Sequence, residues 1–321
     1  MERRNFLKVG LGGLLGLAAT RGLYGGGMSP SAGKLVRRPL GRTGETLSII
    51  GLGGMALARE PQEEVNRLVR EAFECGVNYF DVAPTYGNAQ DVLGPALKPY
   101  REKSFLACKT QARDRKGAED ELHASLEKLM TDHVDLYQFH ALNKVEDVEK
   151  ILGPDGAMET FLKAREDGKI RFIGFSAHSS EAAVEAMSRF DFDTVLFPIN
   201  YVCVFNAGFG PAVIKKAREK KMGILAIKAM AKTPWPKDSR REGCAKCWYQ
   251  PVTDPAEAGL ALRYTLSQPV TAAVPPGDPG IFRRALQTAL SFTPIGKAEE
   301  SDLRRMAAPV KPLFELHPPV A

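Results

Sequence analysis

The chain has 321 residues, of which 44% are apolar and 26% are charged, with 5 cysteines and a formal net charge of +6. This composition is typical of a soluble globular enzyme, and it excludes a collagen-like chain, a disordered chain and a multi-span membrane protein. Much of the positive charge lies in residues 1–25. Because no long basic run follows, nucleic acid is not an expected partner.

The N-terminus has the pattern of an export signal. Residues 3–8 read Arg-Arg-Asn-Phe-Leu-Lys, and an uncharged run rich in Gly, Leu and Ala follows from Val9 to Thr20. That run is too short to span a bilayer comfortably. The pattern resembles a twin-arginine (Tat) signal, which implies the twin-arginine export machinery as a partner and a periplasmic location. We therefore expect a signal peptide over residues 1–27 and no stable membrane span after processing.

Short apolar or β-branched runs then alternate with helical patterns. The runs begin near Ser48, Val77, Phe105, Val134, Ile170, Thr194, Ile224 and Thr271. Between them, apolar residues recur on one helix face, as in residues 65–73, 122–129 and 258–266. Gly76, Gly168 and Gly223 hold the places of helix C-caps that lead into strands.

Eight strands alternating with helices predict an α/β fold with a parallel sheet. The sheet is either open and doubly wound or closed into a barrel. The even spacing, the count of eight and the absence of G-x-G-x-x-G after the first strand favour a (β/α)₈ TIM barrel. We expect this barrel domain, with a C-terminal tail, over residues 35–321.

Two additions to the barrel are expected. Leu35–Arg38 and Thr46–Ile49 flank a glycine-containing turn, which predicts an N-terminal β-hairpin across the bottom of the barrel. Residues 229–253 form a long insert, expected as a loop near the active face. This insert contains Cys244 and Cys247 in a C-x-x-C pair. A disulfide, a redox pair and free thiols are all compatible with the pair, and no second pair or nearby His completes a metal site.

Polar residues gather where the predicted strands end, which is where barrel enzymes carry their chemistry. The second strand ends at Asp81, and Tyr86 follows five residues later. The third, fourth and fifth strands end at Lys109, His140 and Ser176. A lysine near a tyrosine lowers the phenol pKa from its usual value of about 10, and a carboxylate keeps that lysine charged. With a histidine to align a carbonyl oxygen, such a set protonates an oxyanion as hydride arrives at carbon, which implies a nicotinamide cofactor.

Residues 81–94 resemble the segment of aldo-keto reductases that carries the catalytic Asp and Tyr. Lys109 and His140 complete a tetrad similar to that of the family, and residues 51–55, 169–176 and 261–269 also look like family segments. The resemblance implies that Tyr86 is the general acid in reduction and the base in oxidation. Asp81 and Lys109 would tune Tyr86, and His140 would orient the substrate.

The resemblance also implies positions that bind the cofactor. These are Ser176, which matches the residue that bonds the nicotinamide amide, and Asn200, Lys228, Gly277, Arg283 and Arg284. Lys228 replaces the usual stacking aromatic residue, and Ala177 replaces an Asn. Arg283 or Arg284 would bind the 2′-phosphate, which favours NADP(H) over NAD(H), although two solvated helix arginines explain the pair equally well.

The expected function is an NAD(P)(H)-dependent oxidoreductase that interconverts an aldehyde, ketone or sugar carbonyl with an alcohol. One alternative is a non-catalytic barrel that senses nicotinamide or binds a partner. Another is a thiol redox or metal protein built on Cys244 and Cys247. Export in the folded state implies a cofactor that is bound beforehand and retained. Trp235, Trp248 and Tyr249 in the insert either wall a substrate pocket or pack the loop onto the barrel.

Overall fold

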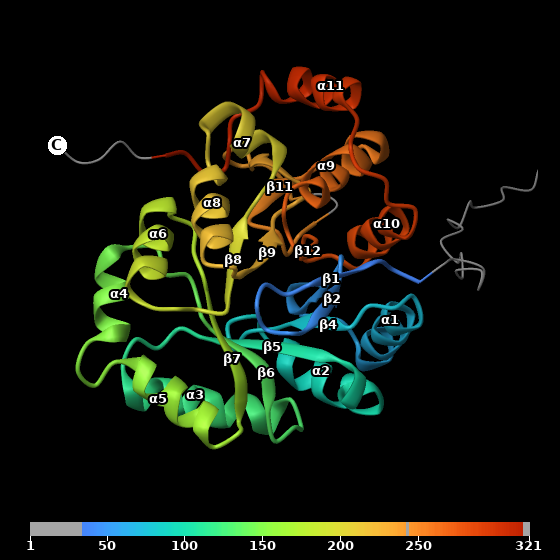
Figure 1. Cartoon of the computed structure of the whole chain (residues 1–321). Coiled ribbons are helices and arrows are strands. Elements are labelled where there is room, and N and C mark those ends of the chain that lie inside the picture. The colour runs from blue at the N-terminus through green and yellow to red at the C-terminus, as the bar shows by residue number, and fades with distance from the viewer. Residues whose placement is uncertain (1–33, 242–243, 317–321) are drawn as a thin grey trace, which may run out of the picture. The chain divides into compact units, whose positions relative to one another are not determined.

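The computed structural model describes residues 34–241 and 244–316. The expected signal peptide at residues 1–27 lies outside the described residues. Within them, eight parallel strands form one sheet in which each strand pairs with the next (Figure 1). A parallel bridge between Ile50 and Ala273 brings the chain before the first strand against the last strand. The predicted (β/α)₈ barrel is therefore confirmed.

The barrel strands, in their order around the sheet, are β3 (Leu52–Gly53), β4 (Tyr79–Asp81), β5 (Phe105–Thr110), β6 (Val134–Phe139), β7 (Ile170–Ser176), β8 (Thr194–Pro198), β9 (Gly223–Ile227) and β12 (Ala272–Val274). Every residue of β5 and β6 is buried. Burial of both faces is expected for parallel strands that are covered by helices, and it agrees with the four apolar residues among the six of each strand.

The helices surround the sheet (Figure 1). They are α1 (Gln62–Glu74), α2 (Ala89–Leu97), α3 (Arg115–Lys128), α4 (Val145–Leu152), α5 (Ala157–Glu166), α6 (Ser180–Arg189), α7 (Tyr201–Ala207), α8 (Pro211–Glu219), α9 (Pro255–Ser267), α10 (Pro279–Leu290) and α11 (Lys297–Ala307), with 3₁₀ turns η1 (Gly54–Ala56) and η2 (Lys98–Lys103). The apolar face predicted for residues 65–73 is the buried face of α1. Every described helix is too short or too polar to cross a membrane.

Two of the three predicted glycine caps have the left-handed backbone that the role requires. Gly76 has φ +97° and Gly168 has φ +72°. The prediction for Gly223 is wrong, because this residue begins β9 and Lys221, with φ +54°, makes the left-handed turn before it. Gly223 is needed for close packing instead. A Cβ atom there would lie 2.4 Å from Cδ1 of Leu40 in the N-terminal hairpin.

That hairpin consists of β1 (Arg37–Pro39) and β2 (Thr46–Ser48), paired antiparallel as predicted. Leu40 and Leu47 are fully buried and join the apolar cluster inside the barrel. Because Leu40 contacts the first residue of β9, the hairpin closes the amino-terminal end of the barrel. The predicted cover of the barrel bottom is confirmed.

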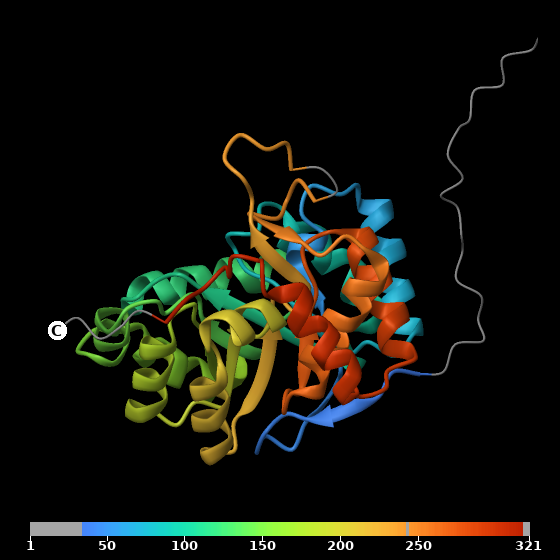
Figure 2. The ribbon, with the colours of Figure 1, turned by 90° about the horizontal axis from the view of Figure 1, so that it is seen from above.

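The insert at residues 229–253 is more ordered than the predicted loop. It contains β10 (Ala231–Pro234) and β11 (Tyr249–Pro251), which pair antiparallel as a two-stranded ribbon. The ribbon and its loop project at the end of the barrel opposite the N-terminal hairpin (Figure 2). This is the end at which the strands finish, so the insert borders the predicted active face.

Candidate active site

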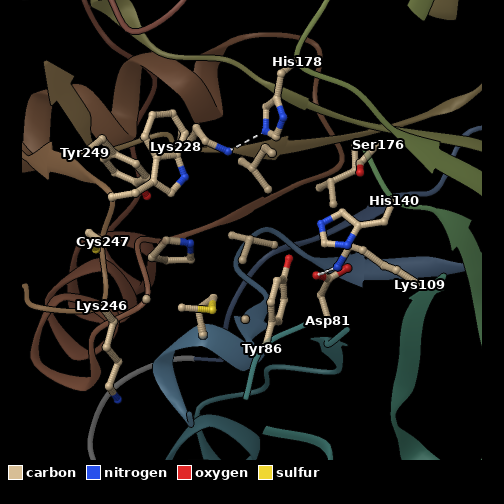
Figure 3. Close-up of a pocket in the computed structure, with 18 residues that line it drawn as sticks. Asp81, Tyr86, Lys109, His140, Ser176, His178, Lys228, Lys246, Cys247 and Tyr249 are labelled. Atoms are coloured by element: carbon tan, nitrogen blue, oxygen red, sulfur yellow. Dashed lines mark hydrogen bonds and ion pairs between the residues drawn. The ribbon is translucent and has the colours of Figure 1, made fainter. Parts of the chain in front are cut away.

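A cavity of about 200 Å³ opens at the carboxyl ends of the strands (Figure 3). Asp81, Tyr86, Lys109 and His140 all line it. Its volume lies below the roughly 300–1,000 Å³ typical of sites for drug-sized ligands. The structure therefore brings the four predicted catalytic residues to one place.

Asp81 and Lys109 form a buried ion pair at the floor of this cavity. Asp81 ends β4, Lys109 lies on the neighbouring strand β5, and Nζ of Lys109 donates to Oδ1 of Asp81. The hydroxyl of Tyr79 and the amide of Gln138 donate to Oδ2 of Asp81 at 3.2 and 3.1 Å. Burial opposes the charge of Lys109, but Asp81 and the Tyr86 phenol outweigh it and raise the lysine pKa. Lys109 is therefore a permanent cation.

Tyr86 stands on the turn between β4 and α2, beside that cation. Nζ of Lys109 lies 5.1 Å from the centre of the phenol ring. A Cβ atom on Gly54 would approach the Tyr86 ring to 3.3 Å, so a glycine leaves room for it. Burial raises the pKa of the Tyr86 phenol, and Lys109 opposes only part of that rise. The net direction is opposite to the one expected from the lysine alone, because burial of the phenol has the larger effect.

His140 faces Tyr86 from the end of β6. Its backbone amide donates to the carbonyl of Thr110 at 2.8 Å, and its Nδ1 lies 3.5 Å from Oγ1 of Thr85. Burial, followed by the charges of neighbouring lysines and an arginine, lowers the pKa of His140 to about 3. The imidazole is therefore neutral at physiological pH, and a neutral imidazole both donates and accepts a hydrogen bond.

The backbone after His140 is held in an unusual conformation. Ala141 has φ +56°, a left-handed conformation that is strained for a residue with a Cβ atom. Arg113 donates to the carbonyls of His140 and Ala141 at 2.8 and 3.1 Å. The amide of Ala141 donates to Oγ of Ser176 at 2.8 Å. These contacts fix the position of the His140 ring, and they leave the hydroxyl proton of Ser176 for another partner.

The opposite wall of the cavity carries Lys228 and His178. Lys228 directly follows β9, is 8% exposed, and its Nζ lies 2.9 Å from Nε2 of His178. The His178 ring stacks on Phe314 of the C-terminal tail, with centroids 5.2 Å apart. Sequence reasoning missed the role of this tail residue, since 136 residues separate the two rings along the chain.

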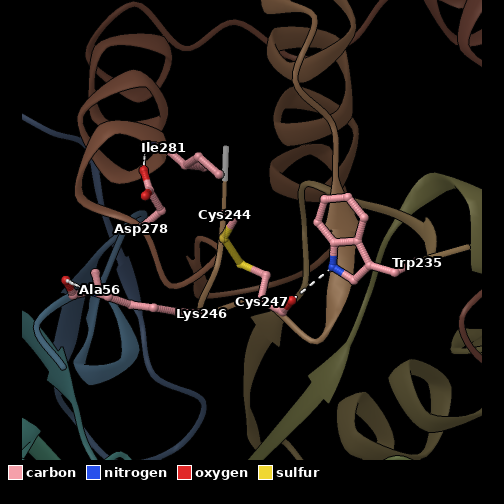
Figure 4. The surroundings of a disulfide bond; sticks show 7 residues. All are labelled: Ala56, Trp235, Cys244, Lys246, Cys247, Asp278 and Ile281. Carbon is pink, nitrogen blue, oxygen red and sulfur yellow. Dashed lines mark hydrogen bonds between the residues drawn. A yellow bond between two sulfur atoms is a disulfide. The ribbon is translucent and has the colours of Figure 1, made fainter. Parts of the chain in front are cut away.

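The insert forms the remaining wall. Of the three states open to Cys244 and Cys247, the structure has the disulfide (Figure 4). Lys246, which lies between the two cysteines in the sequence, forms an ion pair with Glu60, with Nζ 2.5 Å from Oε1. The indole of Trp235 donates to the carbonyl of Cys247 at 2.9 Å, so this tryptophan braces the loop. Trp248 and Tyr249 line the cavity, as one of the two readings of the insert expects.

The predicted cofactor residues divide into two groups. Ser176, Lys228 and Gly277 line the cavity, whereas Asn200, Arg283 and Arg284 are not among the residues that line it. Asn200 caps α7 by accepting from the amide of Cys203 at 2.9 Å. The part of all six residues in nucleotide binding stays a prediction.

The two arginines have protein partners. Arg283 forms ion pairs with Glu64 and Glu71 of α1 at 2.9 and 2.7 Å. Arg284 donates to the carbonyl of Thr253 at 3.0 Å. Arg283 therefore helps to hold α10 against α1, and its contact with a phosphate stays a prediction. Within residues 34–241 and 244–316, no cluster of three or more His, Cys, Asp or Glu side chains could hold a metal ion.

Comparisons with known proteins agree with this geometry. The model described as "Aldo/keto reductase family" matches residues 49–247. An uncharacterized oxidoreductase of Bacillus subtilis is 32% identical over 155 residues, 44% of this chain and 48% of that protein. The L-galactose dehydrogenase of Arabidopsis thaliana is 26% identical over 215 residues, 62% of this chain and 66% of that protein. The chain thus spans about half to two thirds of the length of these relatives.

The fold has solved counterparts. The holo form of an aldo-keto reductase from Bacillus halodurans superposes with a TM-score of 0.67 at 22% identity, covering 85% of this chain and 96% of that one. At this identity the likeness supports the barrel fold alone. The assignment of the chain to a family rests on the match to residues 49–247.

Proposed function

This chain belongs to the aldo/keto reductase family, and from that premise we propose that it is an NAD(P)(H)-dependent oxidoreductase that interconverts a carbonyl and an alcohol. The observation that carries the proposal is the convergence of Asp81, Tyr86, Lys109 and His140 on one cavity. A barrel that only binds a nucleotide or a partner does not require all four. Aldehydes, ketones and sugars are the substrate classes.

The cavity residues fit the nicotinamide end of the cofactor. Leu196, Ile227 and Val274 provide apolar surface for a flat ring, and Ser176 has a hydroxyl proton to donate. The backbone of Gly277 lies so close to Met55 that a Cβ atom on Gly277 would be 2.5 Å from Cβ of Met55. When bound, the nicotinamide supplies or accepts the hydride at the substrate carbon.

Tyr86 supplies the proton for the carbonyl oxygen in reduction. Its raised pKa keeps the phenol protonated throughout the neutral range, which is the form that a general acid needs. Neutral His140 donates a hydrogen bond to the same oxygen and so aligns the carbonyl. Lys109, fixed by Asp81, stabilises the phenolate that is left after proton transfer. In oxidation the same groups work in reverse.

We propose NADP(H) as the preferred cofactor over NAD(H), with an arginine of α10 on its 2′-phosphate. Arg284 is the better candidate, because its partner is a backbone carbonyl and not a pair of carboxylates. We further propose that residues 1–27 direct the folded protein through the twin-arginine pathway to the periplasm. Little free nicotinamide cofactor is expected there, so the cofactor would be loaded before export and retained.

The experiment that tests this proposal is direct. The protein is purified under native conditions from the exported fraction and denatured, and any released nucleotide is identified. The empty protein is then titrated with NADPH and NADH. We expect a bound nucleotide, or tight binding of at least one of the two. A protein that carries no nucleotide and binds neither would favour a partner-binding or thiol-based function.

A further inference from the structure

Lys228 is a buried amine whose described neighbours include no carboxylate partner. The side chain lines the cavity, is 8% exposed, and Nζ contacts Nε2 of His178 at 2.9 Å. Figure 3 shows the Lys228 amine and the His178 ring meeting on the wall across the cavity from Asp81. The backbone of Lys228 is held at φ +61°, which is strained for a side chain of this length. Backbone strain therefore accompanies the placement of this amine at the cavity.

Of the lysines that line the cavity, Lys228 is the one without an oppositely charged partner among the described residues. Three lysines line the cavity, and Asp81 is the single carboxylate among the lining residues. Lys109 is paired with Asp81, and Lys246 is paired with Glu60. In the part of the chain that the structure describes, Lys228 forms no ion pair with a carboxylate. A buried charge is costly unless it is paired, so this site favours an anion from outside the chain.

Two aromatic rings favour the charged form of the amine. Nζ of Lys228 lies 5.6 Å from the centre of a Trp248 ring and 5.8 Å from that of Phe314. Both distances are within the range of a cation–π attraction. An ammonium has three donors, and His178 takes one of them, so two remain to bond an anion.

We propose that Lys228, supported by His178, binds a carboxylate on the substrate, so that the enzyme acts on carbonyl compounds and alcohols that carry a carboxylate. The reacting carbonyl lies at Tyr86 and His140, while the carboxylate lies at Lys228. This assignment rests on the proposed function for the chemistry, but the binding of a carboxylate does not depend on it. A nucleotide phosphate is the other anion that could meet Lys228, and the experiment separates the two.

Proton uptake by Lys228 when a carboxylate binds offers a second way to test this assignment. Burial and the charge of Lys109 lower the pKa of Lys228 to about 7, and Cys203 opposes that fall. At about pH 8 the free amine is therefore mostly neutral, and a bound carboxylate raises its pKa and makes it take up a proton. The other groups that face it do not interfere. His140 and His178 are neutral, with pKa values of about 3 and 2, and the raised pKa of Lys109 keeps that lysine charged.

The test compares benzoate with benzamide, which has nearly the same shape and no charge. Dissociation constants are measured on the full-length protein by tryptophan fluorescence, since Trp248 lies beside Lys228. We expect benzoate to bind about ten-fold tighter or more, because a charge-assisted hydrogen bond is stronger than a neutral one. K228M should lose that preference and leave benzamide unchanged. K246M, the matched control, changes a lining lysine that already has a carboxylate partner, and it should keep the preference.

Equal binding of benzoate and benzamide by the wild type would overturn the assignment. So would a K228M variant that keeps the benzoate preference but binds NADPH about ten-fold more weakly, since the lysine would then serve a nucleotide phosphate. If K228M does not fold, calorimetry of the wild type in two buffers decides the question. Benzoate should take up close to one proton at about pH 8 and benzamide none, and no uptake with benzoate contradicts the assignment. A failure of hydride transfer, with the benzoate preference intact, would refute only the proposed function.

Discussion

The phenol ring of Tyr86 meets the imidazole of His140 edge to face, with ring centroids 5.8 Å apart and an interplanar angle of 88°. Lys109 lies over the same phenol ring, 5.1 Å from its centroid. The Tyr86 phenol therefore has a neutral imidazole on one side and the Lys109 ammonium on another. This is the arrangement that a developing oxyanion requires.

Removal of the Tyr86 hydroxyl should greatly reduce the turnover rate. Tyr86→Phe keeps the ring and its packing but lacks the proton, so we expect turnover to fall by about 10²–10⁴-fold, the usual contribution of general acid catalysis. Nucleotide affinity should stay the same. Steady-state rates with a small aldehyde check this. Tyr100→Phe, on η2 outside the cavity, is the control and should keep wild-type rates.

The buried ion pair between Asp81 and Lys109 should contribute strongly to the stability of the fold. Asp81→Asn leaves the ammonium of Lys109 buried without its carboxylate, since both side chains are at most 3% exposed. Loss of one partner of a buried pair costs about 3–5 kcal/mol. Urea unfolding measures this cost. Asp91→Asn removes an exposed carboxylate that lies 3.6 Å from Lys128 and should cost less than about 1 kcal/mol. Equal costs for the two variants would contradict the burial argument.

Acid should destabilise the protein through its two cavity histidines. The pKa values of His140 and His178 are about 3 and 2 in the folded protein, against about 6.5 in the unfolded chain. Between these values the unfolded state binds more protons, so stability falls as the pH is lowered from about 6.5 towards 3. By about pH 4, each histidine should have lowered the free energy of unfolding by on the order of 3 kcal/mol. Denaturant unfolding over this pH range, compared with His140→Gln and His178→Gln, measures the effect, and a slope that neither variant reduces would contradict it.

The two helix arginines should behave differently. Arg283→Ala breaks the ion pairs to Glu64 and Glu71 and should lower stability by about 1 kcal/mol, because these pairs are partly exposed. It should leave the ratio of NADPH to NADH affinity unchanged. Arg284→Ala should weaken NADPH binding, because it removes the proposed contact with the 2′-phosphate. A lower NADPH preference in the Arg283 variant alone would place the phosphate contact at Arg283 instead.

The disulfide should be dispensable for turnover. Cys244→Ser opens the bond to Cys247 but removes none of the groups around Tyr86. We expect the variant to keep most of the wild-type rate and to lose some thermal stability, because the loop closed by the bond gains freedom. A thiol-based redox protein predicts the opposite, namely loss of activity here and full activity in Tyr86→Phe.

Much of this site could be predicted from the sequence for a geometric reason. Asp81, Lys109 and His140 lie at or directly after the carboxyl ends of three consecutive strands, and these ends meet at one face of a barrel. Their residue types then specify the chemistry. The strand runs were legible because parallel strands are buried on both faces.

Other features depend on contacts that no local pattern encodes. Arg283 reads as a free helix cation, but its carboxylate partners lie 212 and 219 residues away along the chain. The contact between His178 and Lys228 joins residues 50 positions apart. The sign of the Tyr86 pKa shift depends on how deeply the phenol is buried. The ribbon of β10 and β11 was missed because its strands are short and rich in polar residues and proline.

The most direct test of the central claim follows the hydride itself. The wild type and Tyr86→Phe are each mixed with NADPH or NADH that carries deuterium at the transferable position, together with a small aldehyde. The alcohol product is then analysed by mass spectrometry. We predict deuterium on the product carbon with the wild type, and at least about 100-fold less product with Tyr86→Phe. Equal labelled product from both proteins, or unlabelled product from the wild type, would contradict the account.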